Sequence, residues 1–523
     1  MRYGFAIDHS RCIGCHACSV ACKEENDVPL GVYRTWVKYV ETGAFPDARR
    51  TFSVLRCNQC EDAPCMDICP TAALFRRDTG IVDFDGKDCI GCKSCMQACP
   101  YDALYIDPST NTAAKCHYCS HRVDRGIQPA CEVVCPEQAI LSGDLDEPES
   151  AISKFTAREA TTVRKPEKGT RPKVFYKEAA PQNLDPGAAG RGTGYMAAQE
   201  QGSAERRGRQ AMGAAGLWTR ESGARLDEAR DLAEARVTYD ARHAERPWAW
   251  RVSAYIWTKA IAAGAVLVAA LARAAGTSTQ GDGLLAASSG LGVLFLALTG
   301  VLLVADLKQP TRFLKILTRP QWKSWLVRGA VILTGYGACL TAVLALGAVG
   351  AATAASALLW PLAALALGTA VYTAFLFHQA RGRDYWQSAL LAPHLGLQAV
   401  LAGAAALLLA SPWVPAALEA APFLGRVLAA ALVLDAVVIG LGERQMRRGT
   451  PDQRRAASWV THGPGRLPFL VGSIAIGHVV AIVLVLLSGS IENGLLWGAG
   501  CALLGLAIHE HLWICAGQDP PLS

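Results

Sequence analysis

The chain has few cysteines after its first 135 residues and few long apolar runs before its second half. Only three of its 19 cysteines follow Cys135, and almost all long apolar runs follow Val252. This uneven distribution excludes a single soluble globule, a disordered chain and a small secreted disulfide-rich protein. A length of 523 residues also exceeds one typical domain, and we expect two or three.

Motifs for nucleotides and for export are also lacking. No GxGxxG or P-loop pattern stands between a strand and a helix, which argues against nicotinamide or ATP chemistry. The opening MRYGFAIDHSRC has neither an apolar stretch nor a twin-arginine pair, so we expect no export of the N-terminal region. The net charge is +6, but the basic excess lies in a linker and between apolar runs, which indicates membrane topology rather than binding to nucleic acid.

Sixteen cysteines form four groups of four. Groups one and three have the spacing C-x2-C-x2-C-x3-C, group two has C-x2-C-x4-C-x3-C, and group four has eleven residues between its second and third members. In chain order the groups are Cys12, Cys15, Cys18 and Cys22; Cys57, Cys60, Cys65 and Cys69; Cys89, Cys92, Cys95 and Cys99; and Cys116, Cys119, Cys131 and Cys135. Three thiolates on a tight loop can hold three irons of a cubane, while the fourth points to a neighbouring cluster.

The residues around these cysteines favour iron–sulfur clusters over zinc or disulfides. Pro70, Pro100 and Pro136 each follow a fourth cysteine, where a missing N–H costs nothing in a first helical turn. Gly14 and Gly91 let backbone amides approach the cluster sulfurs. Zinc sites usually use two CxxC pairs, and disulfides need an oxidising compartment. The sequence therefore predicts four [4Fe–4S] clusters bound by all sixteen cysteines.

With these motifs, residues 1–145 resemble the four-cluster iron–sulfur subunits of the dimethyl-sulfoxide and polysulfide reductase type. Lys23, where the bacterial ferredoxin motif has proline, is a minor departure. The resemblance implies an α+β ferredoxin-like domain that transfers electrons in a complex molybdoenzyme. It also implies that group one pairs with group four and group two with group three. The implied sets are Cys12, Cys15, Cys18 and Cys135; Cys116, Cys119, Cys131 and Cys22; Cys57, Cys60, Cys65 and Cys99; and Cys89, Cys92, Cys95 and Cys69.

Residues 146–247 are rich in Ala, Gly, Arg and Glu and cannot bury a core of their own. We expect a polar linker that is partly helical or disordered. For residues 202–245, a solvated helix and a disordered tether both remain open. The short apolar run Val174–Phe175–Tyr176 is expected to pack back onto the ferredoxin-like domain.

Residues 248–523 contain eight apolar stretches, each near the ~20 residues that a bilayer core requires. They run approximately over 252–272, 284–305, 327–347, 355–377, 391–410, 424–441, 468–488 and 495–512. Eight in series with short connections argue against buried helices of a soluble protein. The sequence predicts an all-α bundle of eight transmembrane helices, in which Cys339, Cys501 and Cys515 are small apolar packing residues.

The charges of the loops predict the orientation in the inner or plasma membrane. With eight spans, the loops on the side of both termini carry fourteen Lys and Arg residues, against two on the opposite side. The positive-inside rule then places the iron–sulfur domain in the cytoplasm. Basic loops that dock an acidic iron–sulfur surface are an alternative explanation of the same bias.

Two stretches, DLKQPTRFLKILTRPQWKSWLVRGA (306–330) and the C-terminal HLWICAGQDPPLS, resemble the NrfD and polysulfide-reductase family of eight-helix, quinone-interacting anchors. A quinone site needs groups that bind carbonyls and exchange protons, at the membrane face nearest the clusters. The candidates are Tyr255 and Lys259 on one helical face, Asp306, Tyr372, His378 and His394 at similar depth, and Asp435 further inside. Lys259 could instead snorkel, Asp306 could pair with a loop arginine, and His378 could be a loop residue.

Together the two halves predict a fused electron-transfer and membrane subunit. Electrons would pass between menaquinone or ubiquinone and a catalytic molybdopterin subunit on another chain, which would carry the terminal substrate site. Two alternatives remain: a self-sufficient oxidoreductase between a soluble carrier and quinone, and a non-redox membrane scaffold stapled by zinc.

Overall fold

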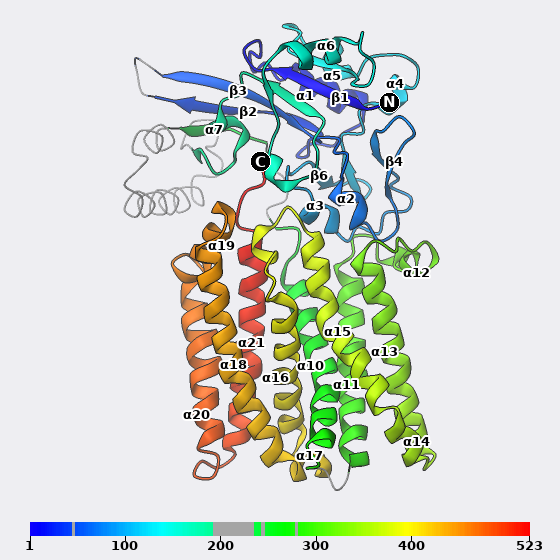
Figure 1. The fold of residues 1–523 in the computed structure, drawn as a ribbon, viewed down its shortest axis with the longest axis vertical. Helices are drawn as coiled ribbons and strands as arrows, with labels where there is room; N and C mark the ends of the chain where they lie inside the picture. The colour runs from blue at the N-terminus through cyan, green and yellow to red at the C-terminus, as the bar shows by residue number, and fades with distance from the viewer. Residues whose placement is uncertain (44–45, 47, 192–234, 242–245, 278–280) are drawn as a thin grey trace. The chain divides into compact units, whose positions relative to one another are not determined.

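The computed structural model describes residues 1–43, 46, 48–191, 235–241, 246–277 and 281–523. The chain forms two compact units, Met1–Pro247 with Pro521–Ser523, and Trp248–Pro520 (Figure 1). The described part of the first unit combines strands with short helices, whereas that of the second unit contains helices only. The predicted fold class is confirmed: an α+β region that contains the cysteine motifs is followed by an all-helical region.

Two four-stranded sheets and two hairpins support the first unit. In the first sheet, β1 (Tyr3–Asp8) lies between antiparallel β8 (Ile140–Asp144) and parallel β10 (Val174–Lys177), with β9 (Thr161–Thr162) at the edge. The second sheet has the order β11 (Gly190–Arg191), β12 (Arg236–Tyr239), β2 (Thr35–Thr42), β3 (Arg49–Arg56). The hairpins pair β4 (Leu74–Arg76) with β5 (Val82–Phe84), and β6 (Leu104–Ile106) with β7 (Ala113–Lys115).

Short helices carry or follow the cysteines of the first unit. They are α1 (Ala17–Glu25), α2 (Pro64–Asp67), α3 (Ser94–Ala98), α4 (Ser120–Val123) and α5 (Ala130–Val133). Further along lie α6 (Ala151–Arg158), the 3-10 turn η1 (Pro166–Lys168) and α7 (Pro181–Leu184). These helices are one or two turns long and cannot be stable alone, so packing must hold them in place.

The region predicted as a linker is in part a structural member of the first unit. Val174 to Tyr176 pair in parallel with Phe5 to Ile7 of β1, and Val174 and Tyr176 are fully buried, so the expected packing of this run is confirmed. Residues 146–191, expected in a linker, contribute the helices α6 and α7 and the strands β9, β10 and β11 to the first unit. The strand β10 has only four residues, so its apolar content does not show in the average composition of a hundred-residue segment. The helix or tether expected over 202–245 lies outside the described residues, apart from 235–241.

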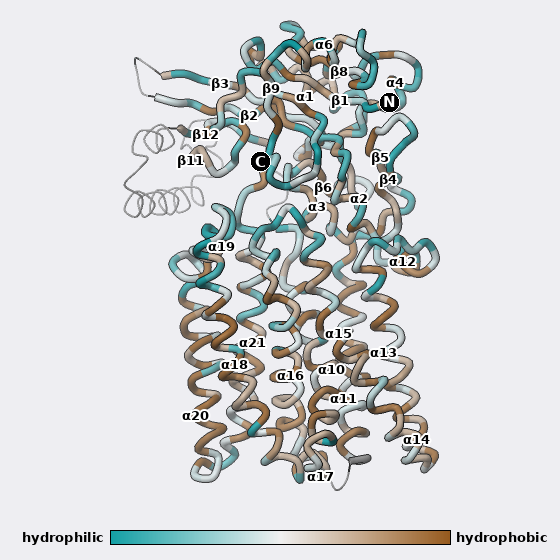
Figure 2. The backbone as a smooth tube through the Cα atoms, viewed as in Figure 1, coloured by the Kyte–Doolittle hydropathy of each residue, from teal (hydrophilic) through white to brown (hydrophobic). Residues whose placement is uncertain are grey.

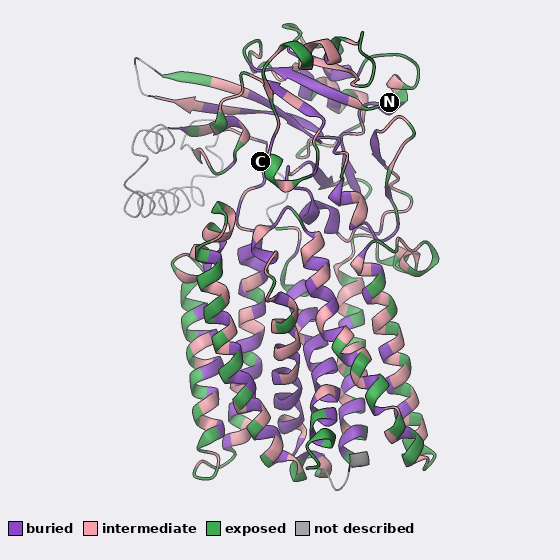
Figure 3. Cartoon of the chain, viewed as in Figure 1, coloured by how far each residue is buried: buried purple, intermediate pink, exposed green. Residues whose placement is uncertain are grey.

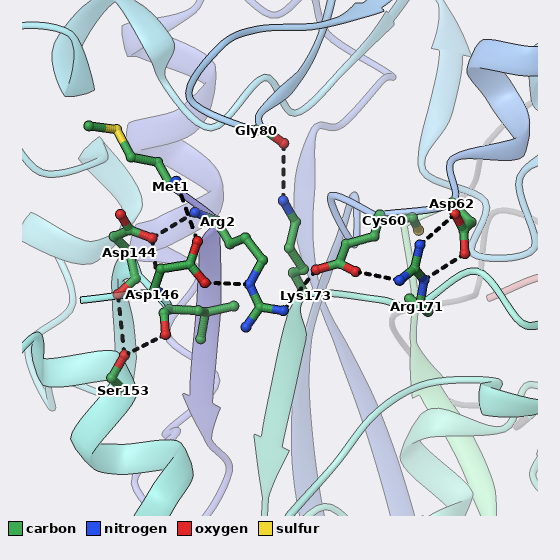
Figure 4. Close-up of polar contacts among 12 residues, drawn as sticks. Met1, Arg2, Cys60, Asp62, Gly80, Asp144, Asp146, Ser153, Arg171 and Lys173 are labelled. Carbon is green, nitrogen blue, oxygen red and sulfur yellow. Dashed lines mark hydrogen bonds and ion pairs between the residues drawn. The ribbon is translucent and has the colours of Figure 1, made fainter. Parts of the chain in front are cut away.

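Ion pairs join the start of the chain to this same segment. The Arg2 guanidinium lies 2.8 Å from Asp146 and 3.0 Å from Glu61, and the amino group of Met1 lies 3.3 Å from Asp146 (Figure 4). Arg171 contacts Glu61 at 3.1 Å and also binds Asp62. Residues on both sides of the predicted boundary thus belong to one polar network.

Among the described residues of the second unit, eight helical segments are long and apolar enough to cross a membrane, as expected. They are α10 (Trp250–Ala274), α11 (Gly281–Asp306), α13 (Trp325–Ala348), α15 (Leu359–Gln379), α16 (Leu391–Ala410), α18 (Ala421–Arg447), the π-helical η5 (Pro468–Val480) with α20 (Ala481–Leu486), and α21 (Gly494–Gly517). Short helices lie in the connections: η3 (Pro310–Arg312), α12 (Lys315–Thr318), α14 (Ala352–Ala357), η4 (Asp384–Trp386), α17 (Pro415–Glu419) and α19 (Pro451–Thr461). The fourth span begins at Leu359 rather than 355, because Pro361 fits only the first turn of a helix.

Helix α10 is the most enclosed of the spans. It packs against α11, α15, α16 and α21 and is buried along most of its length (Figure 3), whereas α11 and α13 are as apolar along the chain (Figure 2) but mostly not buried. The backbones of α10 and α16 touch: a Cβ on Gly264 would lie 1.7 Å from the carbonyl oxygen of Ala399. This close packing of small residues, typical of helices in lipid, fixes the side chains that α10 presents to α15 and α21.

Candidate iron–sulfur centres and membrane site

The structure brings the cysteines together in sets that mix the sequence groups. Cys22 lines one cavity with Cys116, Cys119 and Cys131. Cys99 lines a second cavity with Cys57, Cys60 and Cys65. The thiol of Cys12 interacts electrostatically with those of Cys15 and Cys135, and the thiols of Cys92 and Cys95 with that of Cys69. In each case cysteines of one group lie near the fourth cysteine of another.

One backbone feature repeats in all four cysteine loops. The residue directly before the second cysteine has a left-handed conformation: Gly14 (φ 71°), Gln59 (φ 46°), Gly91 (φ 69°) and Tyr118 (φ 63°). Such a residue turns the chain sharply, so that successive amides and thiols face the same point. At Gly14 a side chain is also excluded sterically, because a Cβ would lie 2.4 Å from the Phe52 ring.

Two of these positions hold large residues, and buried hydrogen bonds explain how the strained backbone is maintained. The Gln59 side chain donates to the carbonyl of Cys116 at 2.9 Å and accepts from the amide of Val82 at 2.8 Å. The Tyr118 hydroxyl donates to the carbonyl of Gly4 at 2.6 Å and accepts from the amide of Gly143 at 2.9 Å. These side chains tie two cysteine loops to the surrounding hairpin and sheet.

Backbone amides already point at the sulfurs. The amides of Gly91 and Ala113 lie 3.4 and 3.3 Å from the Cys89 sulfur, and the amide of Ala139 lies 3.2 Å from that of Cys135. Amide-to-sulfur hydrogen bonds stabilise a negatively charged cluster and raise its reduction potential.

Arg56 is a fully buried cation among the cysteines. Its Nη1 donates to the Cys131 sulfur at 3.1 Å, its guanidinium lies 4.3 Å from the centre of the Phe5 ring, and its Nε and Nη2 have no hydrogen-bond partner among the described residues. Arg56 also lines the cavity of Cys22, Cys116, Cys119 and Cys131. A buried guanidinium without a carboxylate partner, and with two nitrogens that make no hydrogen bond among the described residues, is costly, so the arrangement fits a site that holds an anionic group.

The thiols themselves lie in a poorly solvated environment. Burial raises the pKa of Cys116 to about 12, and the Arg56 guanidinium acts in the opposite direction. Burial also raises the pKa of Cys65 and Cys95 well above the ordinary value for a thiol. Bound iron supplies the positive charge that keeps such cysteines in the thiolate form.

In the membrane unit, Lys259 is buried rather than snorkelled. Its ammonium group donates to the carbonyl of Ala370 at 2.9 Å and to the Thr373 hydroxyl at 2.6 Å, and it lies 4.9 Å from the centre of the Tyr372 ring. Tyr372 fits because Gly329 of α13 has no side chain: a Cβ there would lie 2.2 Å from the Tyr372 ring. Tyr255, one turn before Lys259, interacts electrostatically with Tyr372. Three of the predicted residues, Tyr255, Lys259 and Tyr372, therefore share one polar site between α10 and α15.

The remaining predicted residues divide into three places. His394 and Asp435 meet in a second polar site, where His394 Nε2 lies 2.9 Å from Asp435 Oδ1. His378 lies in the last turn of α15, and its Nε2 is 3.0 Å from the carbonyl of Ser388 in the following connection. Asp306 ends α11 and interacts electrostatically with Tyr255.

Sequence reasoning missed three residues of these membrane sites. His478, in the π-helical η5, contacts Asp435. His509 and Glu510 are neighbours on α21, where His509 is half-buried and Glu510 is buried, and Glu510 interacts electrostatically with Lys259 and Asp435. An acidic residue within an apolar span indicates function, so Glu510 could have been recognised from the sequence alone.

Four cysteine sets in one unit, followed by eight membrane-length apolar helices, define an iron–sulfur protein fused to a membrane anchor. The chain belongs to the polysulphide reductase NrfD family, whose family model matches residues 240–520. Residues 49–145 match the family model of the 4Fe-4S dicluster domain. Both sequence resemblances are thereby confirmed.

Relatives of the first unit are components of reductases. The chain is 44% identical over 179 residues to a subunit of the tetrathionate reductase of Salmonella typhimurium. The aligned region covers 34% of this chain and 72% of that protein. It is 42% identical over 177 residues to a component of the polysulfide reductase of Wolinella succinogenes, and this alignment covers 33% of the chain and 93% of that protein. It is 34% identical over 226 residues to the arsenate respiratory reductase iron-sulfur subunit of Shewanella sp., and this alignment covers 34% of the chain and 96% of that protein. The chain is an iron–sulfur, multi-pass membrane protein of electron transfer in a respiratory oxidoreductase.

Proposed function

We propose that this chain carries electrons between a membrane quinone and a separate catalytic subunit through four [4Fe–4S] clusters. The observation that carries the proposal is the union, in one chain, of four mixed cysteine sets and a buried polar site inside a membrane bundle. The clusters supply one-electron transfer, and the quinone supplies a carrier of two electrons and two protons that dissolves in lipid.

The proposed cluster ligands are the four cross-paired sets of the sixteen cysteines. Left-handed turns, amides aimed at sulfur and the buried Arg56 all suit an anionic inorganic core. All the cysteines are free of disulfide bonds. The mixed sets, in which three cysteines of one group lie with the fourth of another, favour cubanes over zinc.

The proposed quinone site is formed by Tyr255, Lys259 and Tyr372. The Lys259 ammonium and the tyrosine hydroxyls are donors that can bind the two carbonyl oxygens of a quinone, and the Tyr372 ring gives an apolar surface for the quinone ring. Asp306, near the end of α11, is close enough to influence Tyr255 electrostatically. We place His394 and Asp435 beside this site rather than in it, because they contact each other and not the Lys259 group.

The relatives also support a partner and a location. Because the relatives are named as parts of reductases, we propose that a catalytic subunit, of the molybdopterin class, binds the first unit. The excess of Lys and Arg in the loops on the side of the termini supports a cytoplasmic first unit in the inner or plasma membrane.

Substitution of Lys259 tests the quinone site. Lys259→Met keeps the length of the side chain and removes a charged donor, and a lost charge-assisted hydrogen bond costs about 1.5–3 kcal/mol. Quinol-driven bleaching of the iron–sulfur absorbance should therefore slow at least about ten-fold, with the iron content unchanged. The matched control is Lys308→Met, at an exposed position after α11, which should keep the wild-type rate. A wild-type rate in Lys259→Met would remove this residue from the quinone site.

A further inference from the structure

Asp435 is the centre of a buried polar cluster near the middle of α18. Its two carboxylate oxygens face two histidines, with Oδ1 2.9 Å from His394 Nε2 and Oδ2 3.0 Å from His478 Nε2. Asp435 is 1% exposed and lies twelve residues before the end of α18, about 18 Å along the helix. A carboxylate at such depth is expensive and is retained where it has a task.

The hydrogen-bond pattern requires a proton between Asp435 and His478. His478 Nδ1 lies 2.8 Å from the carbonyl of Ser473, and a carbonyl only accepts, so Nδ1 carries a hydrogen. His478 Nε2 and Asp435 Oδ2 would then be two acceptors facing each other at 3.0 Å unless one more proton lies between them. One proton therefore lies between Asp435 Oδ2 and His478 Nε2.

Glu510 is the opposite case, a buried carboxyl group without a fixed partner. It is 3% exposed, and neither of its oxygens has a hydrogen-bond partner among the described residues. It lies on α21, which packs against both α10, the helix of Lys259, and α18, the helix of Asp435. A buried carboxyl group that no hydrogen bond holds is available to take up a proton and to release it.

His394 gives the cluster an outer end. Its side chain is 16% exposed, against 1% for Asp435, and it stands in the first turn of α16. The polar groups lie in the half of the bundle in which α10 and α16 begin. Beyond them, residues 399–408 of α16 and 260–270 of α10 are apolar and lie in or against the buried core of the bundle.

We propose that Glu510 and the cluster of Asp435, His394 and His478 form the proton route of the quinone site, open at the membrane face where α10 and α16 begin. The inference rests on the proposed function. When a quinol is oxidised, its two O–H bonds break, two electrons leave one at a time to the iron–sulfur clusters, and two protons remain. Glu510 accepts the first proton and passes it to Asp435, and a proton already held by the cluster leaves through His394. Glu510 is then free for the second proton, and quinone reduction runs the same steps in reverse.

Two isosteric variants of the full chain in native membrane vesicles test this route. Glu510→Gln and Asp435→Asn keep shape and polarity but cannot carry a proton. The measurements are the rate of cluster bleaching by added quinol, in H2O and D2O, and the affinity for the inhibitor 2-heptyl-4-hydroxyquinoline N-oxide. Because positioned proton transfer contributes ~10²–10⁴-fold, both variants should bleach at least ~100-fold more slowly, while inhibitor affinity stays within about two-fold. Glu510→Asp, which restores a carboxyl group, should recover a substantial part of the rate with a larger isotope effect.

The matched control is Glu443→Gln on the same helix as Asp435. Glu443 binds the Tyr385 hydroxyl at 3.1 Å, outside the route, and its variant should keep the wild-type rate. Wild-type bleaching in Glu510→Gln would overturn the proposal, as would loss of rate and inhibitor affinity together, since Glu510 would then be part of the quinone pocket. If the variant does not fold, a wild-type rate in Asp435→Asn overturns the proposal equally. Failure of quinol to bleach the wild-type chain would instead contradict the proposed function.

Discussion

Replacing Cys131 by serine should remove one cluster, about four irons, from each chain and stop electron transfer through the first unit. Cys131 is buried at the start of α5, lines a cavity with Cys22, Cys116 and Cys119, and accepts a hydrogen bond from Arg56. Iron analysis and electron paramagnetic resonance of the reduced protein would measure the loss. The control is Cys339→Ser in α13, where the thiol packs against the apolar core and the iron content should not change.

The same measurement on a second variant shows whether Cys22 binds the cluster of Cys131 or the cluster of its own sequence group. Cys22 belongs by sequence to the group of Cys12, but in the structure it lines the cavity of Cys131. Cys22→Ser should therefore abolish the resonance signal that Cys131→Ser abolishes and spare the others. Loss of different signals in the two variants would contradict the cross-paired sets.

Arg56→Met should lower the reduction potential of the same cluster by on the order of 100 mV. The Arg56 guanidinium is fully buried beside the Cys131 sulfur, and a nearby positive charge stabilises the reduced, more negative state of a cluster. A redox titration followed by electron paramagnetic resonance would measure the shift. The shift is large enough to alter the order in which electrons occupy the centres.

Arg50→Met is the matched control for Arg56. Arg50 lies on the same strand, β3, but is exposed and pairs with Glu41 at 3.0 Å, so solvent screens its charge. The midpoint potentials of this control should equal those of the wild type. Equal potentials in Arg56→Met as well would show that Arg56 only fills space among the cysteines.

Features with a fixed spacing were predictable from the sequence. The cysteine motifs follow from regular intervals, and the eight spans follow from the length needed to cross a bilayer. In the structure the cysteines gather in sets, and eight helical segments of that length are present among the described residues. The strand β10 was visible as a short apolar run, but its partner β1 lies about 170 residues away, so only the fold shows that residues 146–191 complete a sheet.

Residues whose role depends on burial were not predictable. Arg56 reads as one basic residue at the end of a strand, and nothing local shows that it faces four cysteines. Gln59 and Tyr118 occupy left-handed positions where sequence rules expect glycine, because distant backbone groups hold their side chains. Asp435 was found by its depth in an apolar run, and Glu510 satisfies the same rule, but its neighbours Lys259 and Asp435 come from other helices.

The last three residues form a second covalent connection between the two units. Pro521–Ser523 belong to the first unit, where Arg164 and Lys165 donate to the carbonyl of Leu522 at 3.2 and 3.3 Å and Leu522 is buried. The polypeptide thus leaves the first unit at Pro247 and rejoins it after Pro520. A closed path of this kind permits only an even number of membrane crossings, so helices could be gained or lost in this architecture only in pairs.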